Sequence, residues 1–174
     1  MKRFFLLLLA VVFAASTFAE SDLVKIPTVK LGAVTVGYSR TKGATVAPNP
    51  EAERVTVAHG SSVGITLENA GANAEHVTVR WFAVGRYETS RNFCRNGDGE
   101  KAVSLPPKSS QDFIADCNIE SHDTKSTKGS YKSGGKLVGW VVAMYDNKGK
   151  LLSSAASDPN LDQFAAKPPA LQRK

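Results

Sequence analysis

The chain has 174 residues, of which 42% are hydrophobic and 22% charged, and its 22 basic and 16 acidic residues give a net charge of +6 at pH 7. This length fits one domain of ordinary size with its own buried core. The charge permits weak attraction to anionic envelope polymers or acidic glycans, but the basic residues do not form the dense stripe of a nucleic-acid binder. We therefore expect no nucleic-acid partner.

The N-terminus has the three parts of a secretory signal peptide. Lys2 and Arg3 precede an apolar run over residues 4–15, and small residues follow before the cleavage that we expect between Ala19 and Glu20. The run is shorter than the ~20 residues of a membrane-spanning helix, and we expect no transmembrane segment in the mature chain. We therefore predict an exported protein of the periplasm, the cell surface or the extracellular space.

Apolar residues alternate with polar ones along most of the remaining chain, which predicts about eight short β-strands. The segments with alternation or with short β-rich runs are residues 33–40, 53–58, 63–69, 76–87, 92–95, 102–105, 111–117, 137–145 and 150–154. Two of them, which contain Trp81 and Trp140, are apolar on both faces, as is typical of central strands in a two-layer β structure.

Turn residues separate these strands, and one short helix follows them. "RNGDGE" and "YDNKGKLL" predict hairpin turns, and "LPPKSS" ends a strand because proline cannot donate to a β-ladder. Asp158 and Pro159 suit the N-cap and first position of a short helix that covers one end of the core. We expect a disordered tail over residues 167–174. The pattern predicts one all-β domain over residues 20–166, an antiparallel sandwich or barrel.

Cys94 and Cys117 are the only two cysteines of the chain. Because both lie in the exported part, we predict a disulfide between them. Closing a loop of this size would stabilise the fold by roughly 3–4 kcal/mol in the chain-entropy model. The alternatives are two free thiols or half of a metal site, but two cysteines without clustered histidines make a poor zinc site.

Two short motifs resemble nucleotide-binding or catalytic sequences but lack the required context. "GSYKSGGKL" has Gly129 and Gly134 at the spacing of a phosphate-binding loop, yet Gly135 stands where the lysine should be, and a strand follows instead of a helix. "GSSVG" matches the nucleophile-elbow pattern around Ser62, but the residues after it alternate as a strand. We interpret the first as a flexible loop and the second as a hairpin turn, and we predict no catalytic residues.

The residues that could bind a metal are scattered. His59, His76 and His122 are never at ligand spacing. The acidic turns "NGDGE" and "YDNKG" offer fewer oxygen ligands than the six to eight that calcium takes. We therefore predict no metal and no cofactor.

A polar segment, "ESHDTKSTKGSYKSGG", precedes the last central strand, and we predict it to be a loop. Lys125, Lys128, Lys132 and Lys136 lie close together in sequence around Tyr131. An exposed aromatic ring among cations suits an acidic glycan or another anionic partner. A solvated loop tyrosine is the simpler interpretation, and both stay open.

Three segments carry a resemblance to a known group of proteins: "HVTVRWFAVGRYE", "GEKAVSLPPKSSQDF" and "SYKSGGKLVGWVVAMYDNKGKLLSSAASDPNLDQFA". Over residues 54–166 the chain resembles small exported bacterial proteins with a single immunoglobulin-like domain. The resemblance implies an immunoglobulin-like antiparallel β-sandwich of about eight strands with a short C-terminal helix. It also implies a surface-assembly role, since some such domains accompany type IV pilus-like systems. Both cysteines follow Trp81, so any bridge differs from the inter-sheet disulfide of antibody domains.

We expect a non-enzymatic binding or surface-assembly module of the bacterial envelope, with an envelope or extracellular protein or an acidic glycan as its partner. One alternative is a carbohydrate-binding module, which requires solvent-exposed rings at Trp81, Trp140 or Tyr131. The other is a small hydrolase, which requires a pocket that places Ser62 or a histidine beside a carboxylate. The sequence leaves the oligomeric state open.

Overall fold

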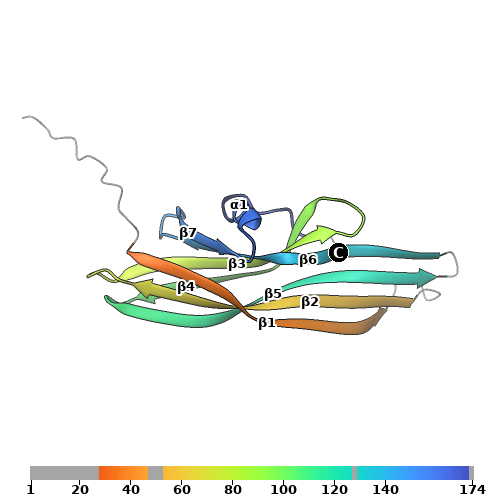
Figure 1. Ribbon diagram of the computed structural model, residues 1–174, viewed down its shortest axis with the longest axis horizontal. Coiled ribbons are helices and arrows are strands. Elements are labelled where there is room, and N and C mark those ends of the chain that lie inside the picture. The colour runs from red at the N-terminus through yellow and green to blue at the C-terminus, as the bar shows by residue number, and fades with distance from the viewer. Residues whose placement is uncertain (1–27, 47–52, 127–128, 173–174) are drawn as a thin grey trace, which may run out of the picture.

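The computed structural model describes residues 28–46, 53–126 and 129–172, and these form an elongated, almost entirely β structure (Figure 1). Its elements in chain order are β1 (Val29–Val46), β2 (Glu53–Asn69), β3 (Glu75–Tyr87), β4 (Phe93–Leu105), β5 (Ser109–Ser126), β6 (Gly129–Tyr145), β7 (Leu151–Ala156), η1 (Pro159–Leu161) and α1 (Gln163–Ala166). The predicted signal peptide and its cleavage site at Ala19 and Glu20 lie outside the described residues. Within the described part of the chain, no helix is long and apolar enough to cross a bilayer.

The strands form an immunoglobulin-like sandwich of two antiparallel layers. β1, β2 and β5 pair in this order in the first layer, and β4, β3, β6 and β7 pair in this order in the second. β1-β2-β5 and β3-β6-β7 correspond to strands A-B-E and C-F-G of an immunoglobulin domain, while β4 extends the second layer beside β3. The predicted all-β, immunoglobulin-like sandwich is confirmed, with seven strands in place of about eight.

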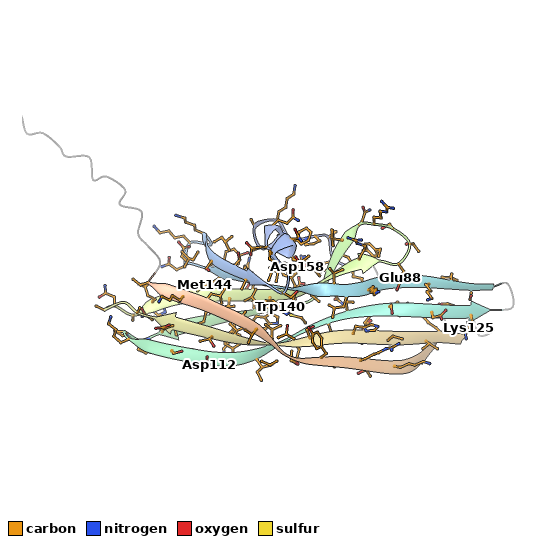
Figure 2. All side chains as sticks on the ribbon, viewed as in Figure 1. Glu88, Asp112, Lys125, Trp140, Met144 and Asp158 are labelled. Atoms are coloured by element: carbon orange, nitrogen blue, oxygen red, sulfur yellow. The ribbon has the colours of Figure 1, made fainter. Side chains whose placement is uncertain are left out.

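The core lies between the two layers and is built from alternate residues of each strand. Its buried side chains include Val63, Ile65, Leu67, Ala115, Cys117 and Ile119 of the first layer and Val77, Val79, Val142 and Met144 of the second. Trp140 lies between the layers (Figure 2) and donates its indole N–H to Thr35 Oγ1 at 2.8 Å. The polar atom of this large side chain therefore has a hydrogen-bond partner on β1.

Two segments that we interpreted as turns lie inside strands. "RNGDGE" is part of β4, where Gly97 has a φ of +63° and a bulge keeps β4 paired with β3 between Trp81 and Ala83. "GSSVG" lies within β2, which runs unbroken from Glu53 to Asn69. Both interpretations were wrong because glycine occurs at bulges and at close backbone contacts as well as in turns. Merging of the predicted strands explains the lower strand count.

The C-terminal helical segment covers the outer face of the second layer rather than one end of the core. The Asp158 carboxylate accepts a hydrogen bond from the Asn160 N–H at 2.8 Å, and Pro159 begins η1, so the predicted cap is confirmed. Leu161 and Ala165 are buried against outward-facing side chains of β3 and β6, which form a second apolar cluster. This cluster explains why both strands are apolar on both faces.

The segment after α1, which we predicted to be disordered, makes defined contacts as far as Gln172. The Arg95 N–H donates to the Ala170 carbonyl at 2.9 Å, and the Arg95 carbonyl accepts from the Gln172 N–H at 2.8 Å. Arg95 Nε also donates to the Pro169 carbonyl at 2.9 Å. The edge of β4 has backbone groups without a strand partner, and these groups bind the tail.

The two cysteines are free thiols, so the predicted Cys94–Cys117 disulfide is not formed in this structure. Cys94 lies on β4 and Cys117 on β5, in different layers, and both are fully buried in the core. Burial raises the pKa of both thiols, and burial together with the neighbouring Asp116 carboxylate raises the pKa of Cys117 to about 12. The reactive thiolate is therefore scarce at neutral pH, and both cysteines act as small apolar core residues.

The first layer extends past the second as a single sheet (Figure 1). β6 pairs with β5 from Gly129 to Gly134 and with β3 from Gly135 onward, so it passes from the first layer to the second at two adjacent glycines. Gly134 has a φ of +88°, and a Cβ there would lie 2.5 Å from the Glu120 carbonyl oxygen. We call this four-stranded extension the arm, and it consists of residues 40–46, 53–59, 119–126 and 129–134.

Candidate binding site on the arm

The pairing of β1 with β2 places basic side chains on one face of the arm. Arg40 lies opposite His59, and Lys42 lies opposite Val57. Residues directly opposite in an antiparallel pair share a face, and so do alternate residues along a strand. Further along β2 the same face carries the core residue Val63. The face is therefore the continuation of the core-facing surface beyond the end of the second layer.

The hairpin of β5 and β6 adds two lysines to this face. Val55 of β2 lies opposite Asp123 of β5, which in turn lies opposite Lys132 of β6. Lys125 is two residues from Asp123 and so shares its face. Lys125 and Lys132 line a hollow of about 340 Å³ together with Arg40 and the other basic residues of β1 and β2. We call this cavity the arm hollow.

Positive charge is in excess in the arm hollow. Four permanent cations line it, namely Arg40, Lys42, Lys125 and Lys132, against the carboxylates of Glu88 and Asp123. The four cationic side chains are exposed, and none of them forms an ion pair with any residue that the structure describes. They are free to form ion pairs with an added anionic partner.

Glu88 marks the point where the second layer ends. It follows the last residue of β3, and its N–H donates to the Gly134 carbonyl at 3.2 Å. Figure 2 shows Glu88 beside β6, while Lys125 lies near the far end of the arm. Glu88 is therefore near the base of the hollow, and the second carboxylate, Asp123, lies further out, opposite Lys132.

The floor of the arm hollow is partly apolar. Val55 and Val57 line it and are half-buried. In the two-layer part of the molecule, the residues at equivalent positions of β2, Val63, Ile65 and Leu67, are buried in the core. The arm thus exposes an apolar strip bordered by cations, which suits a partner that has both carbon surface and negative charge.

The structure brings together only two of the five residues predicted to bind an anionic partner. Lys125 and Lys132 line the arm hollow. Tyr131 is 60% exposed but lies opposite Thr124, on the other face of the same hairpin. Lys136 lies on β6 opposite Arg86 of β3, in the second layer. Lys128 lies outside the described residues.

Sequence reasoning missed the contributions of β1 and β2. Arg40, Lys42 and His59 are about 65 to 90 residues away in sequence from the lysines of the hairpin. The sequence did contain a signal for this face. Every second residue of a strand lies on the same face, and these positions of β1 include Tyr38, Arg40 and Lys42. Only the pairing of β1 with β2 and of β2 with β5 shows that this face also carries the lysines of the hairpin.

His122 borders the arm hollow, but its place on β5, two residues from Thr124, puts its side chain on the opposite face of the sheet, beside a neighbouring hydroxyl. Its Nδ1 lies 2.9 Å from Thr56 Oγ1 across β2 and β5. Burial lowers the pKa of His122, the Arg54 guanidinium lowers it further, and the Glu120 carboxylate acts in the opposite direction. The imidazole is therefore biased towards its neutral form.

The alternative sites find less support in the geometry. Ser62 donates to Asp116 Oδ1 at 2.8 Å and lies in the middle of β2, without the strand–turn–helix context of a nucleophile elbow. Trp140 is 3% exposed. Trp81 is half-buried, with its ring centroid 5.8 Å from that of Phe113. Within the described residues, no group of three or more His, Cys, Asp or Glu side chains is placed to hold a metal ion.

Comparisons with known proteins give no family. No protein-family model and no curated protein sequence matches the chain. Similar solved structures include a putative β-galactosidase from Bacteroides fragilis, with 14% identity over 70% of this chain and 15% of that chain and a TM-score of 0.35. DesR, a β-glucosidase from Streptomyces venezuelae, has 16% identity over 68% of this chain and 14% of that chain, with a TM-score of 0.27. The putative ApaA protein from Bordetella pertussis has 11% identity over 63% of this chain and 90% of that chain, with a TM-score of 0.25.

The chain thus spans only a small part of each of the two glycosidases. All three TM-scores are below 0.5, and the likenesses carry no argument about activity. The candidate site therefore rests on the residues of this chain alone.

Proposed function

We propose that the protein is an exported, non-enzymatic binding module of the bacterial envelope, and that the arm hollow binds an anionic polymer. The observation that carries this proposal is the gathering of four cations from β1, β5 and β6 on one open face, none of them in an ion pair with another described residue. The two carboxylates of the hollow, Glu88 and Asp123, are fewer than its four cations, and the excess like charges repel each other. An anionic partner removes this repulsion.

A polymer fits the arm better than a small anion. The cations lie along an open sheet face rather than around an enclosed pocket, and each is free to contact a different part of an extended ligand. Exposed ion pairs contribute about 0.2–1 kcal/mol each, so useful affinity needs several of them at once. By its resemblance to exported immunoglobulin-like proteins, the module would act in attachment or surface assembly.

The proposal is tested with polygalacturonate and poly-L-glutamate as anionic polymers of matched length. We expect salt-dependent binding, measured by calorimetry at low and at physiological ionic strength. Replacing Arg40, Lys42, Lys125 and Lys132 together by glutamine should weaken it by about tenfold or more, because four contacts of ~0.3–1 kcal/mol are lost. Salt should weaken binding of the unmodified protein more than binding of this variant.

The matched control replaces four exposed lysines elsewhere by glutamine. These are Lys30, Lys148, Lys150 and Lys167. The control variant has the same change in net charge but keeps the four cations of the arm hollow. It should therefore bind much more tightly than the arm variant. Equal weakening by both variants would show that net charge and not the arm attracts the polymer, and absence of binding to both polymers would refute the proposal.

A further inference from the structure

We infer that the anionic polymer is an acidic polysaccharide and that Tyr38 provides the surface on which one of its sugar rings stacks. This inference rests on the proposed function of the arm. It adds a residue that lies next to the arm hollow and names the chemical class of the ligand.

Tyr38 is the most exposed of the large apolar side chains that the structure describes. Its exposed fraction is 81%, compared with 60% for Tyr131. An aromatic ring this exposed contributes almost nothing to the core, and its polar hydroxyl and apolar ring suit a ligand with both kinds of surface. Tyr38 is therefore available for binding at no cost to the fold.

The position of Tyr38 connects it with the cations of the arm. It lies opposite Ser61 on β2, in the same alternating series as Arg40 and Lys42. Alternate residues of a strand share a face and are separated by about 6.8 Å. An extended ligand that contacts the ring of Tyr38 can therefore contact Arg40 and then Lys42 in the same direction.

This combination is better suited to a glycan than to a peptide. A sugar ring presents C–H groups on its faces and hydroxyl groups at its rim, and an acidic sugar adds a carboxylate within the same unit. Tyr38 would contact the ring face, while the guanidinium of Arg40 and the ammonium of Lys42 would pair with carboxylates. The half-buried Val55 and Val57 add apolar surface on the same side.

The edge of β1 is unsuited to strand addition, which is the usual way in which an extended peptide binds to a sheet. An extended peptide that adds to a sheet needs a regular row of backbone donors and acceptors along the edge. β1 has a register shift between Thr35 and Gly37, immediately before Tyr38. Bulges of this kind and edge cations such as Arg40 and Lys42 are devices that prevent strand addition.

Three polymers and one substitution test the inference. The probes are polygalacturonate, poly-L-glutamate and the neutral glycan dextran. We expect polygalacturonate to bind more tightly than poly-L-glutamate at equal charge, and dextran not to bind. Tyr38→Ser should weaken polygalacturonate binding about five- to tenfold and leave poly-L-glutamate binding unchanged. Because Tyr38 is exposed, the variant should keep the urea midpoint of the unmodified protein.

Tyr131→Ser is the matched control, since Tyr131 is an exposed tyrosine of the arm on the face opposite to the hollow. It should leave binding of all three polymers unchanged. If both anionic polymers bind equally and Tyr38→Ser has no effect, the inference is wrong although the arm still binds anions. Tighter binding of poly-L-glutamate would indicate an acidic peptide instead, and equal binding of dextran would exclude a role for charge. Failure of both anionic polymers would refute the proposed function itself.

Discussion

His122 is the side chain whose environment most clearly couples charge to the stability of the arm. Burial and the Arg54 guanidinium lower its pKa, and the Glu120 carboxylate only partly opposes them. Arg54 Nε is itself buried without a hydrogen-bond partner among the described residues. Protonation of His122 would therefore place a second positive charge beside the Arg54 guanidinium.

The expected consequence is a loss of stability at low pH. Because the pKa of His122 is lower in the folded state, the unfolded chain binds more protons as the pH falls through the usual histidine range near 6.5. The stabilisation present above this range is lost as the pH falls to the lowered pKa. Urea unfolding between pH 8 and pH 5 measures this loss. His122→Gln should make the free energy of unfolding depend less on pH.

The exposed His76 supplies the control for this prediction. His76→Gln should reproduce the pH dependence of the unmodified protein. An identical fall in stability for the unmodified protein and for His122→Gln would show that other groups cause the dependence.

At the scale of elements, β6 explains both what the sequence revealed and what it concealed. Its second half was predicted as a central strand, because Val141 and Met144 belong to a run that is apolar on both faces. Its first half was predicted as a loop, because Lys132 and Ser133 lie in a polar stretch. That half is a strand because β5 pairs with it residue by residue. This hairpin pairing joins polar residues and so leaves no apolar alternation in the sequence.

The two glycines at which β6 changes layer give a prediction at this scale. Gly134→Ala should lower the free energy of unfolding by about 1–3 kcal/mol, because the φ of +88° is strained for alanine and the added Cβ meets backbone atoms. Gly43→Ala is the control, since a Cβ there has no atom within 4 Å. It should change stability by less than about 1 kcal/mol. Urea unfolding compares the two, and equal effects would contradict the role given to Gly134.

At the scale of the whole molecule, the sandwich followed from the sequence more readily than the site did. Period-two alternation identifies core residues such as Val63 and Val79 within a single strand, so the fold class needed no knowledge of pairing. The arm hollow needed the register of four strands. Lys125 and Lys132 are close in sequence and were predicted as binding residues. Arg40 and Lys42 share a face with them only because β2 pairs with both β1 and β5.

The central claim is that the inner face of the arm binds an acidic polysaccharide. The most direct measurement is the titration of the ¹⁵N-labelled protein with polygalacturonate oligomers, followed through the backbone amide resonances. We predict that the largest shifts occur at Tyr38, Arg40, Lys42, His59 and Lys132, and that they shrink at high salt. Largest shifts in the second layer, around Arg80 and Tyr145, with none on the arm, would contradict the account.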